Sequence, residues 1–154
     1  MTAPVSRSVV EAFYRAYESR DPQRIAAFLD DDVEWLVAGP AEVMQISGQW
    51  HGKAAVVDRF ARLVPQVIDF PNLHIEHLLV DGDQSAMFGR VTSLHRRTGR
   101  VISHRVAHVA RYYDGKIVYF RVVNDSLDAA EQFIGHPIDL TKDGANTVEV
   151  ESVL

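Results

Sequence analysis

The chain has no cysteine among its 154 residues, which excludes disulfide bonds, thiolate nucleophiles and cysteine-ligated zinc. It also lacks an excess of positive charge, because 16 Lys and Arg stand against 21 Asp and Glu, for a net charge of -5. An acidic chain without a basic stripe argues against a nucleic-acid partner. Its apolar runs are too short to span a bilayer, and its first residues lack a signal-peptide core. We therefore expect a soluble, cytoplasmic protein without a membrane partner.

Motifs for phosphate binding and serine hydrolysis are missing as well. No glycine-rich string follows a predicted strand with the spacing of a dinucleotide or nucleoside triphosphate site. No serine lies in a G-x-S-x-G turn between a strand and a helix.

The composition is that of one globular domain. Apolar residues make up 47% of the chain, enough for a single sizeable core at this length. There is no internal repeat or low-complexity segment. We predict one domain over residues 1–138 and a polar tail over 139–154, which either pairs with a sheet edge or is disordered.

Helix signals dominate the first half. Ser6 or Ser8 can cap a first helix, whose apolar residues recur with helical spacing at Val10, Phe13, Tyr14 and Tyr17. Asp21-Pro22 indicates a second helix, reaching residue 29. A strand at 33–37 and an apolar loop at 38–52 follow, and then a third helix over 53–67 with one apolar side.

The second half changes to strand patterns. Glycine-containing turns separate the predicted strands, and this chemistry is typical of hairpins in an antiparallel meander. A short closing helix or turn is expected over 125–133. The four predicted strands are 73–80, 85–97, 100–113 and 116–123.

Helices followed by a curled sheet indicate an α+β fold. Three N-terminal helices packed against one face of a curved antiparallel sheet would enclose a cone-shaped pocket. The order of elements and several strings resemble the nuclear transport factor 2-like superfamily, in particular its SnoaL-like polyketide cyclase and ketosteroid-isomerase-like branch, over about residues 6 to 135. The strings are Asp31-Asp32-Val33-Glu34-Trp35, Gly39-Pro40, Gly48-Gln49-Trp50-His51-Gly52-Lys53, His108, Tyr113-Asp114-Gly115-Lys116-Ile117 and Asn124-Asp125.

The resemblance implies a polar trio inside the cone. Ketosteroid isomerases carry a carboxylate base there, with a tyrosine and a protonated aspartate that stabilise an oxyanion. The corresponding positions fall near Val37, near Phe13 and at His108, so only the third keeps a polar group. Tyr14 and Tyr17 lie within a turn of Phe13. The familiar steroid isomerisation therefore lacks its base. The resemblance also implies a homodimer through the outer sheet face. Val101, Ala107 and Val109 alternate on that face and are compatible with it, and Arg105 and Arg111 make the face mixed.

His104 and His108 alternate with apolar residues, so both lie on one face of the third meander strand. At a rise of about 3.3 Å per residue they are ~13 Å apart, too far to bind one metal ion together. We therefore predict no metal site. Each histidine can instead bind a ligand or act on it as a general acid or base. Alternatively, each is a core histidine that is hydrogen-bonded to a neighbouring side chain.

We predict His108 as the principal acid or base and Asp125 as its partner. Asp125 has an alternative role as the N-cap of the segment after it. Tyr17 and Tyr14 are the candidate donors to a carbonyl, although a tyrosine in an amphipathic helix is most often a core residue. The predicted substrate-binding residues are apolar for the most part and can equally fill the cone: Trp35, Met44, Trp50, Phe60, Phe88 and His104.

The sequence thus leaves two classes of function open, a small-molecule enzyme or a non-catalytic module. The enzyme would transfer a proton or close a ring beside a carbonyl of a steroid-like or polyketide-like compound. It needs no cofactor, because donors placed in advance can stabilise an enolate. The alternative is an apolar-ligand-binding or dimerisation module. A third reading, hydrolysis of epoxides, requires an arginine between two acids, for which Arg90 or Arg105 with Asp125 is the available set.

Overall fold

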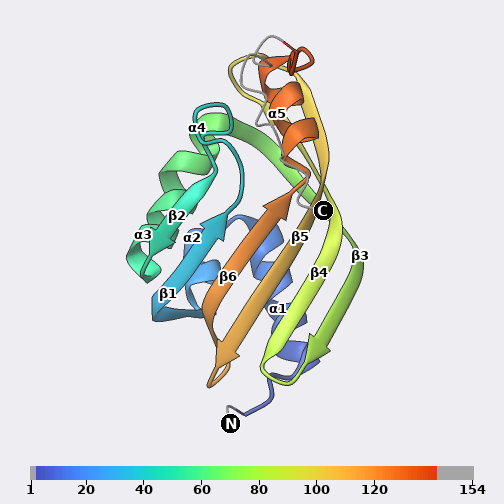
Figure 1. Cartoon of the computed structure of the whole chain (residues 1–154). Coiled ribbons are helices and arrows are strands. Elements are labelled where there is room, and N and C mark those ends of the chain that lie inside the picture. The colour runs from blue at the N-terminus through green and yellow to red at the C-terminus, as the bar shows by residue number, and fades with distance from the viewer. Residues whose placement is uncertain (1–2, 142–154) are drawn as a thin grey trace, which may run out of the picture.

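The computed structural model describes residues 3–141 and has the predicted α+β architecture (Figure 1). Helices cover one face of a curved six-stranded sheet. The helices are α1 (Arg7–Ser19), α2 (Pro22–Ala26), α3 (Lys53–Asp58), the π-helical turn η1 (Arg59–Leu63), α4 (Val64–Val67) and α5 (Ser126–Ile134). The strands are β1 (Leu29–Val37), β2 (Gly48–His51), β3 (Ile68–Asp81), β4 (Gln84–His95), β5 (Val101–Tyr113) and β6 (Lys116–Asn124).

The sheet has the strand order β2-β1-β6-β5-β4-β3. Strands β3 to β6 form the predicted antiparallel meander, whereas β1 runs parallel to β6. At the centre, His108 of β5 lies opposite Met87 of β4 and Val122 of β6. Burial alternates along β5, so His104 and His108 share the inner face with Val106.

Helix α1 begins as the sequence predicts. The Ser6 hydroxyl accepts a hydrogen bond from the Val9 N–H and so caps the first turn. The helix buries its apolar stripe and ends at Arg20, which has a left-handed backbone with a φ of 57°. Glycine or asparagine usually occupies such a position, and a larger side chain costs about 1 kcal/mol there.

The structure differs from the prediction in four segments, one of which is strand β3, which begins at Ile68 rather than at residue 73. The second helix ends at Ala26, because β1 already begins at Leu29 beside Ile117 of β6. The segment predicted as a loop contains β2, which pairs with β1. The third helix spans the predicted residues but widens into the π-helical turn η1.

The closing helix is confirmed as α5. The tail predicted for residues 139–154 lies almost wholly outside the described residues, and its pairing or disorder stays a prediction. Within residues 3–141, none of the helices has both the length and the apolar character needed to cross a membrane.

Candidate functional site

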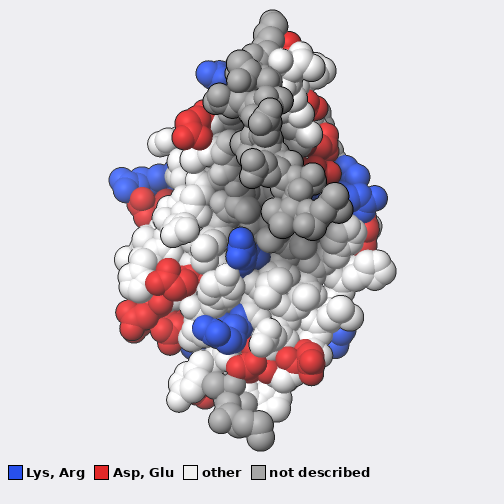
Figure 2. Space-filling view, in the orientation of Figure 1, with Lys and Arg blue, Asp and Glu red and all other residues white. Residues whose placement is uncertain are grey.

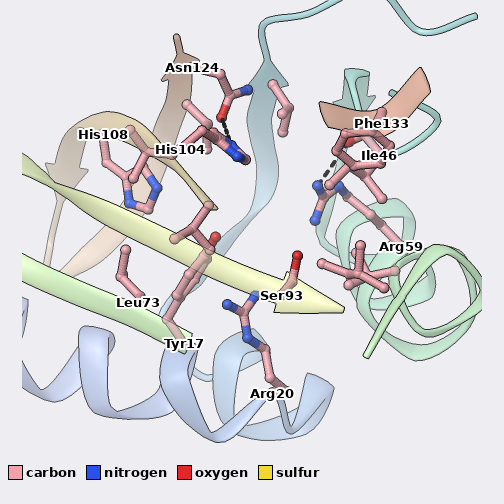
Figure 3. A pocket seen from close by; sticks show the side chains of 16 residues that line it. Tyr17, Arg20, Ile46, Arg59, Leu73, Ser93, His104, His108, Asn124 and Phe133 are labelled. Atoms are coloured by element: carbon pink, nitrogen blue, oxygen red, sulfur yellow. Dashed lines mark hydrogen bonds between the residues drawn. The ribbon is translucent and has the colours of Figure 1, made fainter. Parts of the chain in front are cut away.

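A cavity lies between the helices and the inner face of the sheet (Figure 3). The cavity has a volume of about 50 Å³. The cavity is narrow, and its wall is mainly apolar with a few polar groups, as is typical of small-molecule sites. Its wall consists of Tyr17, Arg20, Val37, Ile46, Arg59, Val64, Ile68, Leu73, Val91, Ser93, His104, Val106, His108, Val122, Asn124 and Phe133.

His108 is a neutral imidazole held by α1. Its Nδ1 is 3.3 Å from the phenolic oxygen of Tyr14. Burial raises the pKa of Tyr14 well above its ordinary value, so the phenol keeps its proton and shares a hydrogen bond with Nδ1, in which the ring tautomer decides which atom donates. Burial, together with the positive charges of Arg20 and Arg59, lowers the pKa of His108 to about 3. When Tyr14 donates, the ring proton is on Nε2, which has no hydrogen bond to another described residue.

His104 has its tautomer fixed by a chain of hydrogen bonds. The Asn124 Nδ2 donates to the carbonyl of Ala38 at 2.7 Å, which leaves Oδ1 as the acceptor. The His104 Nε2 lies 3.1 Å from that Oδ1 and must carry the proton (Figure 3). The Nδ1 of His104 is then a bare acceptor, buried and without a partner among the described residues. Burial lowers the pKa of His104, against the opposing effects of Asn124 and of the Asp128 and Asp125 charges.

Two arginines also line the cavity. The Arg59 side chain is 6% exposed and donates to the Ile46 carbonyl at 2.9 Å. Burial lowers its pKa to about 10, so the guanidinium stays charged at neutral pH. The guanidinium of Arg20 lies 4.6 Å from the centre of the Tyr17 ring. None of the described residues in the cavity wall is Asp or Glu, so the acids needed for epoxide hydrolysis are missing from it.

The structure brings together four of the predicted site residues. Tyr17, His104 and His108 line the cavity, and Tyr14 supports His108 from behind. Val37, at the position of the family's carboxylate base, also lines it. Whether these residues act in catalysis stays a prediction.

Asp125 is placed differently from the prediction. It is exposed at the start of α5, and its side chain makes no capping hydrogen bond. His108 has Tyr14 as its hydrogen-bond partner instead. The reason is strand alternation: Asn124 turns toward the cavity, and the next residue turns away. Asp125 therefore affects His104 only through its charge.

The predicted apolar lining lies mostly around the cavity rather than in its wall. Trp35 and Met44 are fully buried core residues, and Phe60 packs between Tyr17 and Trp35. Trp50, on the edge strand β2, is half-buried beneath the guanidinium of Arg59.

Phe88 is on the wrong side of the sheet for a cavity residue. It faces outward, is 39% exposed and lies near Arg105. The prediction had the wrong face of β4, since Met87, one residue earlier, is the one opposite His108.

Sequence reasoning missed Arg20, Arg59 and Ser93 as cavity residues. A signal for two of them was present. Arg59 follows Val56 by three residues and precedes Phe60, so it lies on the apolar stripe of its helix. Arg20 follows Tyr17 with the same helical spacing. A cation on an apolar stripe indicates a buried charge that needs a partner.

No group of three or more acidic or histidine side chains within residues 3–141 is placed to hold a metal ion.

The class of protein is given by a family comparison. Residues 10–120 match the SnoaL-like domain, and the chain belongs to this family. Curated protein sequences give no match.

Solved structures share the fold. A Rhodopseudomonas palustris protein provisionally named an isomerase is 28% identical, with a TM-score of 0.71, over 82% of this chain and 93% of that one. TerC, co-crystallised with polyporic acid, is 22% identical, with a TM-score of 0.72, over 82% and 96%. A Catenulispora acidiphila protein with a ketosteroid isomerase-like fold, in complex with trimethylamine, is 14% identical, with a TM-score of 0.69, over 86% and 96%. The resemblance to the nuclear transport factor 2-like superfamily is thereby confirmed.

Proposed function

We propose that this protein is a small-molecule enzyme of isomerase or cyclase type, which moves a proton beside the carbonyl group of an apolar, polycyclic compound. The observation that carries the proposal is the pair of neutral imidazoles, His104 and His108, each held by a hydrogen bond in the wall of one apolar cavity. Membership of the SnoaL-like family and likeness to a protein named as an isomerase support this class of reaction.

His108 is the proposed hydrogen-bond donor to the substrate carbonyl. With a pKa of about 3 it is a weak base at neutral pH, but its Nε2–H can donate to an oxygen that gains negative charge. A neutral imidazole polarises the substrate carbonyl in the same way in another enolising enzyme. Tyr14 fixes the ring by donating to Nδ1. This assignment replaces acid–base catalysis by His108 with electrostatic stabilisation.

His104 is the proposed acid–base residue. Its unpartnered Nδ1 can accept a proton from carbon and return it elsewhere. The imidazolium formed keeps its Nε2–H bond to Asn124 and gains from the negative charges of Asp125 and Asp128. Tyr17, beside His108, is a second candidate donor to the substrate oxygen.

A non-catalytic binding protein is the second candidate. Two observations favour it: the narrowness of the cavity and the valine at the position of the family's carboxylate base. Both candidates take a small apolar molecule as partner, and they differ only in whether a proton is transferred.

Deuterium exchange into a simple ketone separates the two candidates. We would incubate the protein with 2-tetralone, a flat bicyclic ketone, in deuterated buffer and follow loss of the protons beside the carbonyl by NMR. The enzyme is expected to accelerate exchange by roughly a hundredfold or more over buffer, as is usual for a positioned acid–base group.

Variants assign the roles in this assay. His104→Gln is expected to abolish the acceleration, and His108→Gln to lower kcat by about a hundredfold to a thousandfold, as for loss of one oxyanion donor. His136→Gln, which changes an exposed histidine, is the matched control and should exchange like the parent protein. Ketone binding without any accelerated exchange would reject the enzyme and favour the binding protein.

A further inference from the structure

The cavity holds two positive charges that no described residue neutralises with an ion pair. Six ion pairs are formed among the described residues, and neither Arg20 nor Arg59 takes part in any of them. Each guanidinium lowers the pKa of His108, and the charge of Arg20 also lowers that of Arg59. Both charges therefore act on the same small space.

Of the two arginines, Arg59 has the greater need of a counter-ion, because its side chain is more than nine-tenths buried. A guanidinium has five N–H donors, and here one nitrogen donates to Ile46 while Nε has no partner. The rings of Trp50 and Phe60 lie 4.8 and 5.0 Å from its central carbon. Aromatic faces attract a cation but offer no full charge, so a buried guanidinium still lacks a counter-ion.

Arg20 reaches the cavity from the end of α1. Its buried Nε also has no hydrogen-bond partner among the described residues, and its guanidinium lies over Tyr17. Its left-handed backbone, with a φ of 57°, disfavours any residue with a side chain. Arg59 likewise begins the π-helical turn, a local widening that is frequent at functional sites.

We infer that the ligand of this cavity carries a carboxylate, which binds between Arg20 and Arg59. The inference rests on the proposed function, in that the cavity must bind an apolar small molecule, and it adds the chemical class: an apolar carbonyl compound that also carries a carboxylate. The hydroxyl of Ser93 falls between the two guanidinium groups in the view of Figure 3 and lines the same cavity. It is a third donor for the carboxylate.

The charge distribution of the wall supports an anion and opposes a cation. Arginine pairs with a carboxylate through two parallel N–H bonds, and such charge-assisted bonds are stronger than neutral ones. The apolar side chains Leu73, Val91 and Val122 would hold the remainder of the ligand. The carboxylate then lies at the arginines while other parts of the ligand face His104 and His108.

Two probes with one carbon skeleton test this inference. 2-Naphthoate and 2-acetonaphthone share the ring and the carbonyl, and they differ in an anionic oxygen against a methyl group. We expect the parent protein to bind 2-naphthoate with a Kd at least about tenfold lower in calorimetric titration, equivalent to about 1.4 kcal/mol. Arg59→Gln and Arg20→Gln should each remove most of this preference and leave 2-acetonaphthone binding within about twofold to threefold.

Arg62→Gln is the matched control, because Arg62 is an exposed arginine of the same helical segment and pairs with Asp58. It should keep the parent preference, and Arg59→Lys should keep part of it. Equal affinity of the parent for both probes would overturn the carboxylate inference and leave the proposed function standing. Absence of binding by both probes would overturn the two together. The comparison in the parent protein decides the question even where a variant does not fold.

Discussion

His104 and His108 lie on the same face of β5, yet their surroundings give them different chemistry. Tyr14 occupies Nδ1 of His108, whereas Asn124 occupies Nε2 of His104. In the tautomers that we propose, His108 presents an N–H to the ligand and His104 presents a lone pair. Strand alternation predicts the shared face from sequence alone. It does not predict the partners, which come from α1 and β6, far away in the chain.

The depressed pKa of His108 predicts a loss of stability in acid. An unfolded histidine takes up a proton below its ordinary pKa of 6.5, whereas folded His108 stays neutral until about pH 3. The unfolded state therefore binds more protons in this window, and the free energy of unfolding falls as the pH is lowered, by up to about 1.4 kcal/mol per pH unit.

His108→Gln should reduce that slope between about pH 6 and pH 4, as measured by urea unfolding at a series of pH values. His104, whose pKa is also lowered, retains a contribution of the same sign. A His108→Gln protein with the parent slope would show that His108 is charged in the folded state.

At the scale of elements, the sequence predicted what periodicity determines and missed what distant pairing determines. The stripe of α1 and the hairpin turns of the meander are local signals, and both are confirmed. Strand β2 has only four residues and forms by pairing with β1. Its own sequence has no strand periodicity, so the segment around it resembles a loop. Helix periodicity places Arg59 on the inner stripe but does not reveal the π-helical turn in which it lies.

At the scale of the molecule, the helices cover only one face of the sheet, and the opposite, outer face is exposed (Figure 1). Figure 2 shows this face, with mainly uncharged residues over its middle and scattered Lys and Arg among them. Phe88 and Val123 flank Ala107 across three strands, and Val109 lies beside them. Three of these side chains are about two-fifths exposed. We propose that a second copy of the chain covers this face.

A homodimer of this kind predicts a mass near twice 17.3 kDa in light scattering. Val109→Glu places like charges against each other at the proposed interface and should shift the protein to the monomer. Leu127→Glu, at an exposed apolar residue of α5, is the control and should remain dimeric. A monomeric parent protein would reject the proposal.

The most direct test of the account is to measure the protonation of the two imidazoles by ¹⁵N NMR of histidine-labelled protein. The account predicts that His104 and His108 are both neutral near pH 7, with the proton on Nε2 in each ring, and that only the Nε2 signal of His108 shifts strongly when a ketone binds. A charged imidazole at either position would contradict this prediction. A proton on Nδ1 of His104 would contradict it as well, because the cavity would then lack its proton acceptor.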